Sequence, residues 1–128
     1  MMDDDNRSKM MVASYLGGCA IATSYVGVVH PFSAGLNVVL GVHHCVANCI
    51  TMRAMEKFHP NEYDEFWKVV DKQGVKVPKG ICSNLTYEQY DQLYASTIIH
   101  EKPLTNALGK DFKKKLTREK VTDIFKKM

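Results

Sequence analysis

Three histidines lie in the one part of the chain from which charged residues are absent. His30, His43 and His44 fall between Lys9 and Arg53, and no Asp, Glu, Lys or Arg occurs in that interval. Imidazole is a ligand for zinc and for divalent iron, and it carries protons near neutral pH. Histidines in an otherwise uncharged, apolar segment predict a buried site that uses a neutral nitrogen ligand. An ordinary helical core is the alternative interpretation.

Two of these histidines have a spacing that suits a shared site. His30 and His44 are 14 residues apart and belong to two different predicted helical segments. A helix, a turn and a returning helix would bring both imidazoles to one point. By spacing alone the signal is weak, because a histidine at a helix end is more often a core or capping residue.

A second metal hypothesis involves thiols. Cys45 and Cys49 are at positions i and i+4, so they share one face of a helix, with His44 beside them. Structural zinc sites usually close with four ligands, and only three are present here. The alternative is that both cysteines are small buried apolar residues. His59 and His100 are expected at the surface.

The elements that must position these residues are all helical, because apolar residues recur with helical period and no alternating strand pattern occurs. Residues 1–7 are expected to be frayed. The first helix, 8–29, is apolar nearly all round, which predicts burial on most sides. Further helices are predicted over 31–40, 43–58, 61–73 and 86–99 and from 117 onward, with a loop over 75–83 and irregular structure over 102–109.

Local signals mark several of the predicted helix ends. Gly41 is expected to end the helix over 31–40. Asn61 is expected to cap the next-but-one helix, over 61–73, and Gly74 to end it. Thr86 with Gln89 forms a capping box, and Thr117 caps the last helix. The chain is therefore predicted to be a single all-α domain, residues 1–128, built as a bundle of about five to seven helices.

Composition limits the classes of binding partner and the cellular compartment that we expect. The 128 residues carry a net charge of +3, with 45% hydrophobic and 24% charged residues, which is ordinary for a soluble domain. The lysines that gather between positions 110 and 127 are interpreted as a solvated face, and the sequence contains no nucleic-acid-binding motif. The acidic start is unlike a secretory signal, so the four cysteines are expected to be reduced and the protein cytoplasmic.

A membrane hairpin is a further alternative. Residues 10–29 carry no formal charge, and 20 such residues are about the length that spans a bilayer. Small and weakly polar side chains interrupt this stretch and the one that follows it. Those side chains suit helix packing inside a protein better than contact with lipid, so we expect no membrane association.

Two segments resemble the metal-binding signature of the iron-containing alcohol dehydrogenases. They are residues 30–36 (His-Pro-Phe-Ser-Ala-Gly-Leu) and 43–50 (His-His-Cys-Val-Ala-Asn-Cys-Ile). The family's two metal histidines are likewise 14 residues apart. The whole chain resembles the C-terminal part of the helical domain of dehydroquinate synthase-like and iron-containing alcohol dehydrogenases. The pair His43–His44 before Cys45, the Phe-Trp-Lys run at 66–68 and residues 98–109 look nearest to the 3-deoxy-α-D-manno-octulosonate 8-oxidase branch.

The resemblance implies a fold, a ligand set and a reaction. A divalent metal, iron or zinc, would be held by one aspartate and three histidines, of which His30 and His44 are two, and the other ligands would lie upstream of this chain. The metal would polarise a substrate hydroxyl, and an NAD(P) cofactor would accept the hydride. The substrate would be a small-molecule alcohol or a sugar acid, with the C8 hydroxyl of a 3-deoxy-octulosonate as the oxidised group.

The chain also departs from the family pattern. Ala34 stands where members often carry a further histidine, His43 replaces a proline, and Cys45 replaces a glycine. No glycine-rich phosphate loop is present, so the nucleotide-binding domain is absent and the chain is expected to be a C-terminal fragment, inactive alone, with weak or absent metal. The alternative is a stand-alone helical module for binding or oligomerisation without catalysis. In either case uncovered apolar surface predicts a homo-oligomer.

Overall fold

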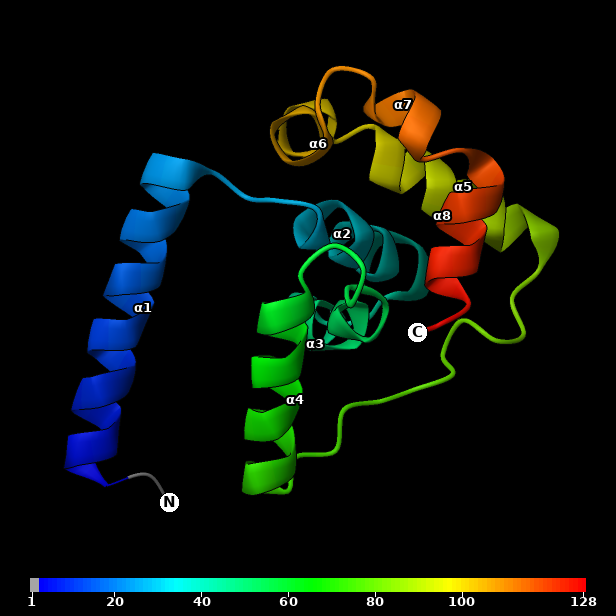
Figure 1. Cartoon of the computed structure of the whole chain (residues 1–128). Coiled ribbons are helices and arrows are strands. Elements are labelled where there is room, and N and C mark those ends of the chain that lie inside the picture. The colour runs from blue at the N-terminus through cyan, green and yellow to red at the C-terminus, as the bar shows by residue number, and fades with distance from the viewer. Residues whose placement is uncertain (1–2) are drawn as a thin grey trace.

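The computed structural model describes residues 3–128, and this part of the chain is all-helical, which confirms the predicted fold class (Figure 1). It contains eight α-helices and one short 3-10 helix, more than the five to seven expected, because two short helices in the second half had no separate signal. The elements are α1 (Asp4–Ser24), α2 (Val29–Leu40), α3 (His44–Thr51), η1 (Met52–Ala54), α4 (Pro60–Gln73), α5 (Tyr87–Ile98), α6 (Glu101–Leu108), α7 (Phe112–Lys115) and α8 (Arg118–Phe125).

The centre of the fold is α2, which packs against α5 on one side and α3 on the other, while α8 packs on α5. Its residues Phe32 and Leu36 are fully buried, and the Phe32 ring lies 5.2 Å from that of Phe125 in α8. Burial of such side chains supplies about 1.5–3 kcal/mol each. The buried apolar core consists of Val28, Phe32, Leu36, Ala47, Ile50, Ala54, Met55, Cys82, Leu93, Leu104, Phe112, Leu116, Val121, Phe125 and Met128.

The close approach of α2 to α5 depends on a glycine. A Cβ added to Gly35 would lie 3.2 Å from Thr97 Oγ1 and 3.3 Å from the Phe125 ring, and 3.5 Å from the carbonyl oxygen of Leu93. These are tight contacts for a methyl group, so a larger residue would push the two helices apart. The histidines at the beginning of α2 and after the end of α5 are held in place by this packing.

Several predicted helix ends are confirmed. Thr86 accepts a hydrogen bond from the Gln89 amide while the Gln89 side chain accepts one from the Thr86 amide, which completes the capping box of α5. Thr117 caps α8. Gly41 and Gly74 follow α2 and α4 with φ of 67° and 62°, the left-handed conformation that glycine adopts without strain.

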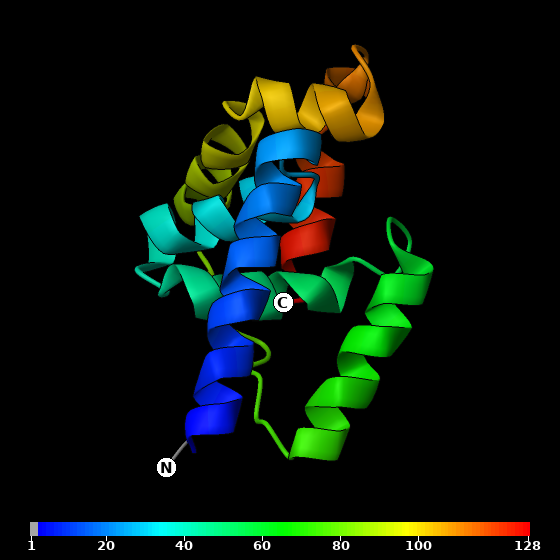
Figure 2. The same cartoon turned by 90° about the vertical axis from the view of Figure 1, so that its left-hand side faces the viewer.

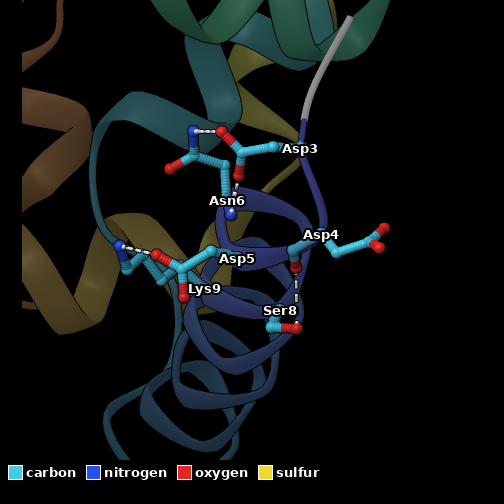
Figure 3. Close-up of polar contacts among 6 residues, drawn as sticks. All are labelled: Asp3, Asp4, Asp5, Asn6, Ser8 and Lys9. Atoms are coloured by element: carbon cyan, nitrogen blue, oxygen red, sulfur yellow. Dashed lines mark hydrogen bonds and ion pairs between the residues drawn. The ribbon is translucent and has the colours of Figure 1, made fainter.

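The predicted frayed start over 1–7 is wrong for residues 3–7, while residues 1 and 2 lie outside the described range. The Asp3 carboxylate accepts a hydrogen bond of 2.8 Å from the Asn6 amide, so α1 begins at Asp4 (Figure 3). An ion pair between Lys9 and Asp5 spans the first turns at 2.5 Å. Capping by a carboxylate at a helix N-terminus stabilises it by about 1 kcal/mol. The same helix ends at Ser24, earlier than the predicted residue 29.

The predicted burial of this first helix is also wrong. No residue of α1 is buried, and Figure 1 shows the helix standing at one side of the molecule. Figure 2, viewed from that side, shows α1 passing in front of the other helices rather than between them. Large apolar side chains are left exposed, including Met11 at 70%, Tyr15 at 72% and Leu16 at 59%. The apolar sequence predicts a buried helix, but no other segment within residues 3–128 covers α1.

The joint between α1 and α2 is sharply bent. The two helices meet at 110° across residues 25–28. Tyr25 ends α1 with φ of 65°, which is the one positive φ of a residue other than glycine among residues 3–128. Over the same described range no single helix is long and apolar enough to cross a membrane, although α1 and α2 taken together pass by length and composition.

Two further boundaries differ from the prediction. The helix predicted over 43–58 ends at Thr51 and is followed by the 3-10 helix η1. Met55, which comes directly after η1, is completely buried. The cap of α4 is not Asn61. Pro60 occupies the first helical position and His59 the cap, because proline lacks the amide hydrogen that this position leaves unpaired in any case.

The segment 102–109, predicted to be irregular, forms α6 instead. Pro103 lies within the first turn, where a missing amide hydrogen costs no helical hydrogen bond. Pro103 and Leu104 are both buried, so packing against the core stabilises the helix. Gly109 follows the helix, with φ of 89°.

Candidate metal centre

His30 lies in the first turn of α2, at the edge of the core. The following residues Pro31, Phe32 and Ser33 are all buried, and the Ser33 hydroxyl donates a 3.0 Å hydrogen bond to the His30 carbonyl oxygen. The imidazole itself is only half-buried. Its backbone is therefore held firmly, while one side of the ring remains accessible to a ligand.

His44 reaches the same place through the turn that ends α2. Gly41 ends the helix, and the Asn37 side-chain amide donates a 2.8 Å hydrogen bond to the carbonyl oxygen of Val42, which closes the turn. His44 is the first residue of α3, and its ring centroid lies 5.4 Å from that of His30 with the ring planes at 77°. The helix-turn-helix arrangement anticipated from the spacing of 14 residues is present. His44 is exposed, so the site is at the surface rather than buried as predicted.

A third histidine, His100, completes the cluster and was expected only as a surface residue. It is half-buried at the break between α5 and α6, where it is the N-cap residue of α6. Its ring centroid lies 5.6 Å from that of His30 with the planes at 76°. His30 contacts both other rings. No local signal pointed to His100, because it is 70 positions from His30 and only the packing of α5 on α2 brings them together.

The cluster favours a neutral His30. Burial lowers the pKa of the His30 imidazole below its usual value, and the positive charges that His100 and then His44 acquire on protonation lower it further. A metal ligand must be the unprotonated imidazole. The neighbours therefore keep His30 in the form that binds a metal at neutral pH.

The donor chemistry fits a divalent zinc- or iron-type ion, for which imidazole is a preferred ligand. The arrangement as it stands is incomplete, because within residues 3–128 no group of three or more His, Cys, Asp or Glu side chains is placed to hold a metal ion. The other two histidines, His43 and His59, occupy helix N-cap positions instead. His43 is the exposed N-cap residue of α3, and His59 is the N-cap residue of α4.

The thiols next to this site line a separate groove. Cys45 is exposed and Cys49 half-buried on α3, both as free thiols. They border a groove of about 210 Å³ together with residues 75–78. This groove is walled mainly by valines and a proline, so it offers the two sulfur atoms no further ligand of its own.

A cavity open to solvent lies between α1 and α6, and its lining on α6 begins at Glu101, the residue that follows His100. It has a volume of about 610 Å³. Lys102 Nζ lies 4.3 Å from the centre of the Tyr25 ring at its edge, and the Asn106 side chain donates a 3.3 Å hydrogen bond to the Ser24 carbonyl oxygen. The lining residues are Ala22, Thr23, Ser24, Tyr25, Glu101, Lys102, Thr105 and Asn106. Hydroxyl, amide, ammonium and carboxylate groups of this kind suit a polar, hydroxylated ligand.

No family model matches the chain.

Proposed function

We propose that this chain supplies two metal ligands, His30 and His44, to a metal-dependent, NAD(P)-linked alcohol dehydrogenase that oxidises a primary alcohol. The single observation that carries the proposal is the 5.4 Å separation of the two imidazole rings, at the 14-residue spacing of the signature that the sequence resembles. The remaining ligands and the nucleotide-binding domain would come from outside these 128 residues, and the chain alone would not turn over.

The described residues would act on the metal and the substrate in distinct ways. When bound, a divalent metal would act as a Lewis acid on the substrate hydroxyl, and nicotinamide would accept the hydride. His30, fixed by the buried first turn of α2, would set the depth of the metal in the cluster. His44, which is exposed, would face the side from which the rest of the enzyme completes the site.

The cavity between α1 and α6 supports a sugar acid as the substrate class. Lys102 would pair with a carboxylate, and the hydroxyl groups of Thr23 and Thr105 and the amide of Asn106 would bind sugar hydroxyls. The C8 hydroxyl of a 3-deoxy-octulosonate is the candidate oxidised group, since this acid carries one carboxylate and several hydroxyls. The cavity residues thus add support from the chain itself to the substrate class that the resemblance implies.

Metal content tests the proposal. Elemental analysis would be made of this chain and of a longer chain with its upstream sequence restored, each carrying His30→Ala, His44→Ala or the control His59→Ala. We expect about one metal per longer chain, lost on either of the first two substitutions and kept in the control. Metal binding that ignores both His30 and His44 would refute the proposal. Turnover of alcohols with NAD(P) by the 128 residues alone would contradict their inactivity.

A second candidate function is a helical module for binding or oligomerisation without catalysis, and it is favoured by α1. This 21-residue helix buries no residue and exposes Met10, Met11, Val12, Tyr15, Leu16 and Ile21. Contiguous exposed apolar surface of this kind marks an interaction site. A second copy of the chain covering α1 would form a homo-oligomer.

Light scattering tests the oligomerisation module. Leu16→Lys places a charge on α1, and Val69→Lys places one on α4 at a residue of the same 59% exposure. We expect an oligomer that dissociates with Leu16→Lys and persists with Val69→Lys. A monomeric wild-type chain at high concentration would count against the oligomerisation module.

A further inference from the structure

A groove of about 390 Å³, the α8 groove, lies between the turn after η1, the end of α6 and α8. It shares no lining residue with the cavity between α1 and α6, and none of the clustered histidines lines it. Volumes of about 300–1,000 Å³ are typical of sites that bind small molecules. The α8 groove is therefore large enough for a ligand of its own.

The floor of the α8 groove is apolar and belongs to the core. Ala54 and Leu116 are buried core residues, and Phe58, Leu108 and Ile124 are partly buried and pack against the core. The packing of the fold fixes these side chains, so the floor exists before any ligand binds. The part of it that faces solvent is apolar surface, and covering that surface with an apolar group would be favourable.

The rim of the α8 groove carries an excess of positive charge. Four lysines line the groove, Lys57, Lys115, Lys120 and Lys127, and Asp123 is the one carboxylate among its lining residues. All five of these residues are exposed. An apolar floor inside a cationic rim is complementary to an anion with an apolar tail, and it disfavours a cation with the same tail.

Three of the four lysines are available to a ligand. Lys115 Nζ already donates a 2.6 Å hydrogen bond to the Leu108 carbonyl oxygen and lies 3.3 Å from the Asp111 carboxylate. By contrast, no ion pair among residues 3–128 involves any of the other three. Lysine is a point charge on a flexible stem, so each ammonium group can move toward an anionic group placed at the rim.

The spacing along α8 aligns these charges with the floor. Lys120, Ile124 and Lys127 are at positions i, i+4 and i+7, which share one helix face. Because a helix rises 1.5 Å per residue, the backbones of the two lysines are about 10 Å apart, with Ile124 between them. A ligand that lies along this face would meet an ammonium group at either end of its apolar contact.

We propose that the α8 groove binds a small anionic amphiphile, a free medium-chain fatty acid with one carboxylate and one alkyl tail. The tail covers the floor and the aliphatic stems of the lysines, since lysine covers apolar surface with its stem while its ammonium group stays in water. The carboxylate lies at the rim beside the available lysines. This site is separate from the proposed dehydrogenase role and shares no residue with it.

Amide chemical shifts of the ¹⁵N-labelled chain locate the ligand. The probe is octanoate, kept below the concentration at which it forms micelles, with octan-1-ol as the neutral molecule of the same tail length. We expect saturable shifts that are largest over residues 54–58, 108–116 and 120–127, and weaker binding of octan-1-ol at the same place. Shifts that are largest over α1, or equal affinity for the acid and the alcohol, would overturn the proposal.

The length of the tail tests the floor. Each buried methylene strengthens binding by up to about fourfold, so decanoate should bind up to about fifteenfold more tightly than octanoate. Equal affinities would show that the tail does not cover the floor, and they would overturn the proposal. Vesicles of phosphatidylglycerol test a membrane source of the same chemistry. Binding to these vesicles without binding of monomeric octanoate would also overturn the proposal.

Substitution of exposed lysines tests the rim without disturbing the core. Octanoate would be titrated into Lys120→Gln/Lys127→Gln and into the matched control Lys110→Gln/Lys114→Gln, whose lysines are exposed but do not line the groove. We expect the affinity to fall about two- to fivefold for each rim lysine removed, the size of an exposed ion pair, and to stay unchanged in the control. Asp123→Asn should raise it. Unchanged affinity in the first variant, or an equal loss in the control, would refute the assignment. Metal binding at the histidines involves none of these lysines, so either result leaves the proposed function standing.

Discussion

Replacing Gly35 by alanine should separate α2 from α5. The added Cβ would lie 3.2 Å from Thr97 Oγ1 and 3.3 Å from the Phe125 ring, closer than the 3.4 Å at which ordinary contacts begin. Neither neighbour can move easily. Thr97 is fully buried and its hydroxyl donates a 2.8 Å hydrogen bond to the Leu93 carbonyl oxygen, and Phe125 is fully buried as well.

Two opposing terms determine the size of the effect. Overpacking a filled core costs about 1–3 kcal/mol, while alanine in place of glycine within a helix gains about 1 kcal/mol. Because the neighbours are fixed, we expect the overpacking term to win and the free energy of unfolding to fall by about 1 kcal/mol. The shift of α2 should also move the His30 ring away from that of His100, which lies 5.6 Å from it.

Gly18→Ala is the matched control, since a Cβ there meets nothing within 4 Å and the residue lies in the exposed helix α1. It should leave stability unchanged or raise it by up to about 1 kcal/mol. The measurement is urea unfolding followed by the exposure of the buried Cys82 thiol. If Gly35→Ala unfolds at the same urea concentration as the wild type, or at a higher one, then the α2–α5 contact is not limiting and the reasoning fails.

Three further predictions concern single side chains. Burial raises the pKa of the Cys82 thiol to about 11, so this thiol is protonated at pH 8. Iodoacetamide should therefore modify the exposed Cys19 and Cys45 rapidly in the native chain and Cys82 only in urea, as measured by mass spectrometry. Rapid labelling of all three cysteines in the native chain would contradict this. Thr86→Ala removes the cap of α5 and should cost about 1 kcal/mol in urea unfolding, an effect that Thr86→Ser should largely restore. Phe125→Ala empties the centre of the core and should cost about 3–5 kcal/mol, so a loss below about 1 kcal/mol would mean that the core rearranges to fill the space.

Local signals in the sequence predicted those features whose cause is local. The capping box at Thr86, the cap at Thr117 and the glycines after α2 and α4 were all identified, because each depends on atoms within a few residues. The errors at Asn61 and over 102–109 also have a local origin. Both places hold a proline in the first turn of a helix, Pro60 in α4 and Pro103 in α6, where the missing amide hydrogen breaks no helical hydrogen bond.

Features that depend on distant partners were predicted poorly. The apolar composition of α1 indicates a helix that prefers burial, but it does not say whether another segment covers it. The pair His30 and His44 was found because a single turn relates them. His100 was missed because its contact with His30 needs α5 to pack on α2 through Gly35, and that close approach is not encoded near either histidine.

The exposure of α1 has a consequence for how the molecule melts. This helix accounts for 21 of the 128 residues and buries none of them, so its loss need not disturb the core. Segments with few buried contacts open at lower free energies than the core does. Backbone circular dichroism should therefore decline before the cooperative transition that exposes the buried Cys82 thiol, and two-state analysis of the dichroism curve would understate cooperativity. If a second copy covers α1, this early decline should shrink as the protein concentration rises.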